Sequence, residues 1–236
     1  VDCAYSSDKQ IFRQLNLRLE PGHIYGLLGK NGAGKSTMLK IISGLNFATS
    51  GNVETLGYQA SRRDARMLQD IFFVPEEIAV PQQSIENFVR INAPFYPNFS
   101  QSDFDKYMNM FEMGEYKQKM SSLSHGQKKK VIISFAIACN TRILILDEPT
   151  NGMDIPSKST FRRIVSTCIS EDSSIIISTH QVRDLQDIID SVIILHESEI
   201  KLLESIGDIT EAFAFKHVSS ETCSQILEKG ELIYEQ

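Results

Sequence analysis

Nine consecutive residues, from Gly29 to Thr37, have the types and the spacing of a loop that holds phosphate groups. They read Gly-Lys-Asn-Gly-Ala-Gly-Lys-Ser-Thr and match the pattern G-x-x-x-x-G-K-[ST] in full. Glycines allow the backbone to turn several N–H groups toward one point. Lys35 then supplies a cation for the β- and γ-phosphates, and the Ser36 hydroxyl can ligate Mg²⁺. The alternative is a chance match, expected in roughly one chain of this length in a hundred.

Two adjacent carboxylates, Asp147 and Glu148, follow the apolar run Ile143 to Leu146. Such a run predicts a buried strand, and the carboxyl ends of parallel strands border the ligand crevice of α/β sheets. Asp147 is suited to hold the hydration shell of Mg²⁺. Glu148 is suited to polarise a water molecule for attack on a γ-phosphate. The alternative, a pair of solvated acids at a strand end, is disfavoured by the phosphate loop upstream.

The segments around the loop predict the elements that position it. Residues 23–28 read as a short buried strand before the loop. Helically spaced apolar residues follow it, and Gly44 stands where that helix should end: Met38, Ile41, Ile42 and Leu45. Alternation over residues 11–20 predicts a strand with one wet face, joined through Pro21-Gly22 to strand 23–28. We expect a small antiparallel sheet beside the main one.

A helical insertion is predicted from about Glu76 to Lys128. Two helical patterns mark it, with Ser102 as the expected N-cap of the second: Ile85, Phe88 and Val89, then Phe104, Tyr107, Met108 and Phe111. We interpret the methionine and aromatic stripe as core, with a surface for a partner as the alternative.

The alternation of strands and helices returns after the insertion. The expected elements are helix 126–139, strand 143–146, a helix beginning near Pro156, strand 175–177, a short helix near 181–188 and strand 192–195. Further strands are expected at 53–56, 71–74 and 212–218, with a helix at 221–229. Continuous β-branched runs are typical of parallel strands covered on both faces. The predicted fold is therefore α/β.

Composition sets wider limits. The chain has 236 residues and a formal net charge of −6, which argues against nucleic acid as a partner because phosphate backbones require a basic footprint. No apolar run approaches the ~20 residues of a membrane span. We interpret the cysteines as free thiols: Cys3, Cys139, Cys168 and Cys223.

Several motifs in the right order resemble the ATP-binding cassette (ABC) superfamily over nearly the whole chain. Besides the phosphate loop, residues 123–127 (Leu-Ser-His-Gly-Gln) look like the signature motif, normally L-S-G-G-Q. Residues 147–154 resemble the Walker B strand end and the D-loop that follows it. Residues 178–180 resemble the switch histidine segment, and Tyr5 lies where the family stacks an aromatic ring on adenine.

This resemblance implies a head-to-tail dimer with two ATP molecules sandwiched between the subunits. The implied nucleotide contacts within one chain are Tyr5, Gly29, Asn31, Gly32, Ala33, Gly34, Lys35, Ser36 and Thr37. The implied contacts to the nucleotide of the facing subunit are Ser124, His125, Gly126, Gln127 and Asp154. The implied Mg²⁺ ligands are Ser36, Asp147 and Glu76, and the implied catalytic residues are Lys35, Glu148 and His180. ATP and Mg²⁺ are the expected cofactors.

His180 follows the strand expected at 175–179, so it should reach the same sheet end as Glu148. Its implied role is to contact the γ-phosphate and to steady the attacking water. The alternative is a local hydrogen bond, which is our interpretation of the other histidines: His23, His196 and His217. Tyr5 has an alternative too, since an aromatic on a strand often serves packing.

Two residues depart from the family pattern. Glu76 stands where a glutamine normally ligates Mg²⁺, and it adds negative charge beside the triphosphate. His125 replaces the first signature glycine. Lys128 to Lys130 follow the signature motif, and we expect a solvated helix face there, with a weak long-range pull on nucleotide as the alternative.

The resemblance implies the ATP-hydrolysing subunit of an ABC transporter, peripheral on the cytoplasmic face of the membrane. Its expected partners are a second cassette and an integral membrane permease, and export of a drug or peptide antibiotic is the expected direction. The expected domain is single, residues 1–236, with a P-loop NTPase core and β-subdomain at 1–75 and 129–236 and a helical subdomain at 76–128. The alternatives are a soluble ABC ATPase and a weakly hydrolysing nucleotide-dependent regulator.

Overall fold

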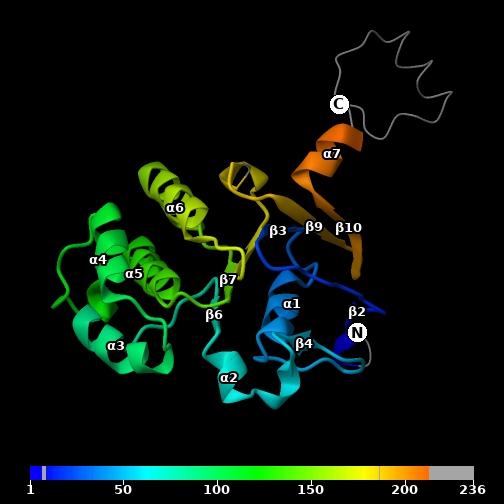
Figure 1. The fold of residues 1–236 in the computed structure, drawn as a ribbon, viewed down its shortest axis with the longest axis horizontal. Coiled ribbons are helices and arrows are strands. Elements are labelled where there is room, and N and C mark those ends of the chain that lie inside the picture. The colour runs from blue at the N-terminus through cyan, green and yellow to red at the C-terminus, as the bar shows by residue number, and fades with distance from the viewer. Residues whose placement is uncertain (7–8, 186, 213–236) are drawn as a thin grey trace, which may run out of the picture.

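A computed structural model describes residues 1–6, 9–185 and 187–212 (Figure 1). Ala212 ends a helix, so the strand expected from this residue is wrong at its start. The rest of that strand, the helix expected at 221–229, His217 and Cys223 lie outside the described residues.

A six-stranded sheet forms the centre, in the order β10-β9-β3-β8-β7-β6. Its strands are β3 (Ile24–Leu28), β6 (Ile71–Val74), β7 (Ile143–Asp147), β8 (Ser174–Thr179), β9 (Ser191–His196) and β10 (Glu199–Ser205). All neighbours pair in parallel except β9 and β10, which are antiparallel. The predicted mostly parallel α/β fold is confirmed.

The apolar runs of these strands are buried on both faces of the sheet. Leu144 packs into one core cluster, while its neighbour Ile145 packs into the other. Ile175 and Ile177 likewise face away from Ile176. Successive side chains of a strand point to opposite faces, so continuous β-branched segments are stable only where helices cover both.

Helices cover the two faces. The α-helices of the described residues are α1 (Lys35–Ile42), α2 (Ala65–Leu68), α3 (Ile85–Asn92), α4 (Gln101–Met110), α5 (His125–Ala138), α6 (Ile155–Cys168) and α7 (Ile206–Ala212). α1 contributes Met38 and Leu39 to one core cluster, whereas α5 and α6 contribute to the other. None of the helices in the described ranges is both long and apolar enough to cross a bilayer.

The insertion between β6 and α5 contains α3 and α4, gathered with α5 at one end of the molecule (Figure 1). Five aromatic rings lie around Phe135 of α5, with centroid distances between 5.1 and 6.3 Å: Phe72, Phe88, Tyr96, Phe99 and Phe104. The aromatic stripe of α4 is core, as predicted, because Phe104 is fully buried. The N-cap of α4 is Ser100 rather than Ser102, since its hydroxyl accepts a hydrogen bond from the Asp103 N–H.

Two small antiparallel sheets flank the core: β1 (Cys3–Ser6) with β2 (Lys9–Phe12), and β4 (Glu54–Thr55) with β5 (Tyr58–Gln59). The strand expected over residues 11–20 is wrong beyond Phe12. A left-handed residue, Gln14 (φ 49°), breaks the ladder, and the chain continues without strand pairing. The alternation in this segment reflects one packed and one wet side, with Leu15 buried, rather than a ladder.

In the segment expected as a helix near 181–188, the residues that the structure describes, all but 186, form only a short 3₁₀ turn, Val182–Asp184. A strand not expected from the sequence, β10, closes the edge of the sheet against β9.

Candidate active site

The phosphate loop lies between β3 and α1, as predicted. Gly34 is the N-cap of α1 and has a left-handed backbone (φ 102°), which glycine adopts without strain. A Cβ atom there would lie only 2.8 Å from Ile11 and Phe12 of β2. Glycine is therefore required by both the backbone and the packing. No side chain caps α1 at Gly34, and an N-terminus of this kind favours a bound anion.

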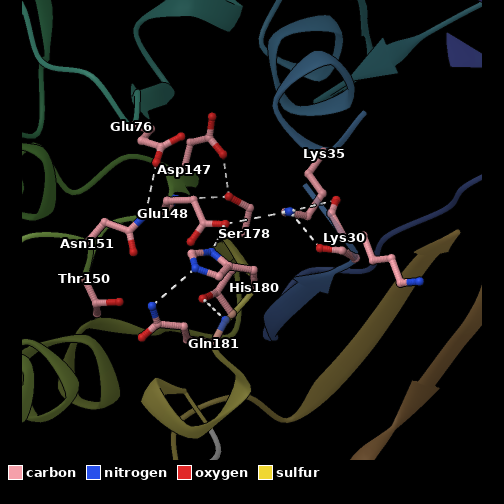
Figure 2. A network of polar contacts seen from close by, with 12 residues as sticks. Lys30, Lys35, Glu76, Asp147, Glu148, Thr150, Asn151, Ser178, His180 and Gln181 are labelled. Atoms are coloured by element: carbon pink, nitrogen blue, oxygen red, sulfur yellow. Dashed lines mark hydrogen bonds and ion pairs between the residues drawn. The ribbon is translucent and has the colours of Figure 1, made fainter. Parts of the chain in front are cut away.

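Lys35 is the first residue of α1 and is 6% exposed. Its Nζ donates a hydrogen bond to the Gly29 carbonyl oxygen at 2.8 Å and lies 3.7 Å from Glu148 Oε1. The ammonium group is thus folded over its own loop and directed at the carboxylates, as Figure 2 shows.

Asp147 and Glu148 lie at the carboxyl end of β7, both buried. The Ser178 hydroxyl on neighbouring β8 donates to Asp147 Oδ1, and it accepts from the Glu148 N–H at 3.0 Å. One hydroxyl therefore holds both acidic residues in register. Sequence reasoning gave Ser178 no role. The only signal was its position just before the Thr179-His180 pair.

Glu148 has a left-handed backbone (φ 46°), a conformation that is uncommon outside glycine. Its Oε1 lies 2.9 Å from Nδ1 of His180. Its Oε2 is buried and has no hydrogen-bond partner. A buried carboxylate oxygen without a partner is costly, and such groups occur where a ligand or water completes the site.

Glu76 follows β6, the strand next to β7, and therefore reaches the same edge of the sheet. Its Oε1 accepts a hydrogen bond at 3.0 Å from the Asn151 side-chain amide. Sequence reasoning missed this contact, which links the join between core and insertion to the loop after β7.

The segment 124–127 forms the start of α5, and its polar side chains cap that helix. The Ser124 hydroxyl accepts from the Gln127 N–H at 3.2 Å, and Gln127 Oε1 accepts from the Ser124 N–H at 2.9 Å. His125 is exposed, and its ring lies against Gly152, where a Cβ atom would come within 2.9 Å of it. Gly152 has φ 78° and could not be replaced without strain or a clash.

Asp154 caps α6 by accepting from the Ser157 N–H at 2.8 Å. Hydrogen bonds from Ser157 lower the pKa of Asp154 below its ordinary value. Ile155 immediately follows, and 83% of it is exposed.

Lys129 overturns the expected solvated face of Lys128 to Lys130. It is 1% exposed, and its Nζ donates to the main-chain oxygen of Glu148 at 2.8 Å. Burial lowers the pKa of Lys129 below its ordinary value, and the charges of Glu76, Glu148 and Asp147 oppose that shift. The signal in the sequence was the almost continuous apolar run over residues 131–139. A helix that is buried on nearly every side also buries some side chains of its first turns.

The family described as ABC transporter matches residues 12–151, more than half of the chain. This chain belongs to that family. It is 31% identical to the lantibiotic transport ATP-binding protein SrtF of Streptococcus pyogenes, over 86% of this chain and 87% of the relative. It is 33% identical to the bacitracin transport ATP-binding protein BcrA of Bacillus licheniformis, over 86% of this chain and 66% of the relative.

The fold of this ABC chain is also found in a solved structure of the ATP-binding cassette MJ0796, described as a dimer in a post-hydrolysis state with ADP and Pi. The TM-score is 0.76 at 24% identity, over 87% of this chain and 96% of that one. The relatives SrtF and BcrA are both named as ATP-binding proteins, and nucleotide binding and ATPase activity are general to the family.

In this ABC chain the oxygens near the phosphate loop suit Mg²⁺, which takes one or two carboxylates together with phosphate and water oxygens. Asp147, which is buried, and Glu76, which follows the neighbouring strand β6, supply hard carboxylate oxygens at this edge. Among the described residues, no three His, Cys, Asp or Glu side chains form a ready-made metal group. This donor set fits an ion that arrives with a nucleotide.

The structure brings together most of the residues expected in one site of an ABC chain. Lys35, from the start of α1 after β3, meets Glu148 and His180 from the ends of the adjacent strands β7 and β8. The segment 124–127 and Asp154 lie at the starts of α5 and α6 instead. Tyr5 belongs to β1, and the side chain of Tyr5 lies outside what the structure describes.

Proposed function

We propose that this chain hydrolyses ATP and that hydrolysis drives export through a membrane permease. The observation that carries the proposal is the setting of Glu148: one carboxylate oxygen lies 2.9 Å from His180, and the other is buried without a partner. A carboxylate with a free oxygen beside a phosphate loop is suited to accept a proton from an attacking water.

Within one chain, we assign the triphosphate to the loop and the start of α1. The residues assigned to it are Gly29, Asn31, Gly32, Ala33, Gly34, Lys35, Ser36 and Thr37, with Tyr5 assigned to the adenine. Lys35 would leave the Gly29 carbonyl and turn to the β- and γ-phosphates. Mg²⁺ would be held by Ser36, Asp147 and Glu76 with phosphate oxygens, and it would neutralise charge on the phosphates.

His180 would act on both the nucleotide and the base. Its ring is 35% exposed while its Nδ1 contacts Glu148, so it borders the site from the solvent side. In this position it would fix the Glu148 carboxylate toward the water and reach the γ-phosphate.

A second copy would complete each site. The residues assigned to the facing nucleotide are Ser124, His125, Gly126, Gln127 and Asp154. The start of α5 is exposed at Ser124 and His125, and its first N–H groups would serve as the anion site. The neighbouring Ile155 exposes an apolar side chain that an interface would cover. The dimer named for MJ0796 supports the same arrangement here.

We assign the core and β-subdomain to residues 1–75 and 129–236, and the helical subdomain to 76–128. The boundary between 128 and 129 falls inside α5, which is continuous from His125 to Ala138. The helical subdomain is therefore anchored to the core by one unbroken helix.

Export is supported by the names of SrtF and BcrA, which are a lantibiotic and a bacitracin transport protein. The permease would dock on residues 76–89, on the cytoplasmic face of the membrane. Large apolar side chains are exposed just beyond that segment, with Ile91 47% and Phe95 68% exposed.

The hydrolysis step is tested by Glu148→Gln. This change should leave ATP binding intact, lower turnover by about 10²- to 10⁴-fold, and trap a dimer with ATP that size-exclusion chromatography detects. The parent protein without ATP is the control. If parent and variant hydrolyse ATP equally slowly and both dimerise, the chain is a nucleotide-dependent regulator instead.

The membrane step is tested by crosslinking. Gln82→Cys in the proposed docking segment should capture the co-expressed membrane protein through a short bifunctional reagent. Lys201→Cys on β10, which is also exposed, is the matched control and should not. Capture by both or by neither would show that residues 76–89 are not the docking site.

A further inference from the structure

Lys129 is a buried cation with a defined partner. Its side chain comes from the first turns of α5, is 1% exposed, and ends 2.8 Å from the main-chain oxygen of Glu148. Lysine is rarely buried unless its ammonium group is paired or hydrogen-bonded, because removing the charge from water is costly. An uncharged side chain of similar length, such as methionine or glutamine, would fill much of the same space without a buried charge. The presence of the charge therefore needs an explanation.

Three carboxylates supply that explanation. Glu76, Asp147 and Glu148 stand at the carboxyl ends of the neighbouring strands β6 and β7, the sheet end at which the Lys129 ammonium group is held by the Glu148 main-chain oxygen. Their negative charges, that of Glu76 first, oppose the lowering of the Lys129 pKa that burial causes. Glu76 stands where the family pattern has a neutral glutamine, so it adds one negative charge at the edge where a triphosphate would lie. Lys129 is a buried positive charge at the same end of the sheet.

The contact to Glu148 has a second consequence. Glu148 has a left-handed backbone, and its carboxylate and its main-chain oxygen are bound on different sides. His180 contacts the carboxylate, whereas Lys129 holds the main-chain oxygen. Fixing that oxygen opposes the relaxation of an uncommon backbone conformation, and so keeps the carboxylate aimed at the phosphate loop.

We propose that Lys129 is a positioning residue of the ATPase site, which holds Glu148 through its main-chain oxygen and balances the charge that Glu76 adds beside the triphosphate. This inference rests on the proposed hydrolysis of ATP. It links Glu76, which departs from the family pattern, to Lys129 of α5.

The test is a double-mutant cycle of Lys129→Met and Glu76→Gln, with nucleotide affinity and kcat measured separately. Affinity is measured with a fluorescent ATP analogue in the presence of Mg²⁺. Lys129→Met should weaken binding about tenfold, since one uncompensated charge then faces the triphosphate, and the double variant should restore it to within about twofold. The loss in kcat, also about tenfold, should persist in the double variant, because Glu148 still lacks its partner.

Two further variants separate this role from simple space filling. Lys129→Gln removes the charge but keeps an N–H donor, so its kcat should exceed that of Lys129→Met while its affinity stays equally low. Lys128→Met changes the neighbouring lysine, which is only half-buried, and should alter neither quantity. Thermal melts of all variants verify folding.

Equal affinity losses from Lys129→Met in the parent protein and in the Glu76→Gln variant would overturn the charge-balancing role. An unchanged kcat in Lys129→Met would overturn the positioning role. A parent protein that binds ATP without hydrolysing it would instead overturn the proposed function, and the affinity arm of the cycle would still decide the charge balance.

Discussion

The phosphate loop and the start of α5 use the same physical device, the N-terminus of a helix, in two different ways. α1 begins at Gly34 with no side chain capping it, and the buried Lys35 stands beside it. α5 begins with Ser124 and Gln127 already hydrogen-bonded to each other's N–H groups. The first N-terminus is open to an anion, and the second is partly satisfied by its own residues.

The difference indicates which of the two helix starts, that of α1 or that of α5, can bind nucleotide without a second chain. The α1 half joins a cation, a carboxylate and a histidine through contacts shorter than 4 Å, at 3.7 Å and 2.9 Å. The α5 half is exposed and offers helical N–H groups, while its buried lysine points inward to the main chain of Glu148. We infer that the α1 half binds nucleotide in a single chain, and that the α5 half acts only once a nucleotide is presented to it.

The largest change in nucleotide affinity is expected from Lys35→Ala. Removing a hydrogen bond to a charged group costs about 1.5–3 kcal/mol, so nucleotide affinity should fall about 10- to 100-fold. Fluorescence titration of the isolated chain measures it. Lys40→Ala, on the exposed side of the same helix, is the control, and an equal loss in both variants would contradict a specific role for Lys35.

A smaller effect is expected at Ser124, where two substitutions separate capping from contact with a facing nucleotide. Ser124→Ala should cost about 0.5–2 kcal/mol of stability through loss of the cap, while Ser124→Asp keeps a capping oxygen. Thermal or denaturant unfolding measures both.

Ser124→Asp should nevertheless weaken ATP-dependent pairing in the Glu148→Gln background, because its charge would oppose the γ-phosphate of the facing subunit. Pairing as strong as in the Glu148→Gln protein would show that the start of α5 does not meet that nucleotide.

The parallel core could be predicted from the sequence because buried strands and amphipathic helices carry strong periodic signals. The run Ile143 to Leu146 was predictable for this reason, whereas Gly34 was predictable from the phosphate-loop pattern. β10 was missed since Glu199–Ser205 mixes charged and apolar residues at an edge, where only pairing with β9 decides. Residues 15–20 were wrongly predicted to be a strand. Alternation of apolar and polar residues indicates one packed and one solvent-exposed side, and it occurs with or without a neighbouring strand.

In the candidate site, the residues with recognisable chemistry were predictable, and their supports were not. Lys35, Glu148 and His180 follow from the phosphate loop and from strand ends. Ser178 and Lys129 act through main-chain or buried contacts, which depend on how strands and helices lie against one another. Three consecutive lysines look alike in a sequence, and only the packing of α5 selects the middle one.

The position of β3 in the sheet has a consequence for biosynthesis. β3 is hydrogen-bonded to β8 on one side and β9 on the other, and both emerge from the ribosome long after it. Until about Thr179 has been translated, the phosphate loop rests on a strand with two open edges, and one edge stays open until about His196. Open edges favour wrong pairing. Premature termination in the second half of the message would therefore yield an aggregation-prone chain rather than a weakened enzyme.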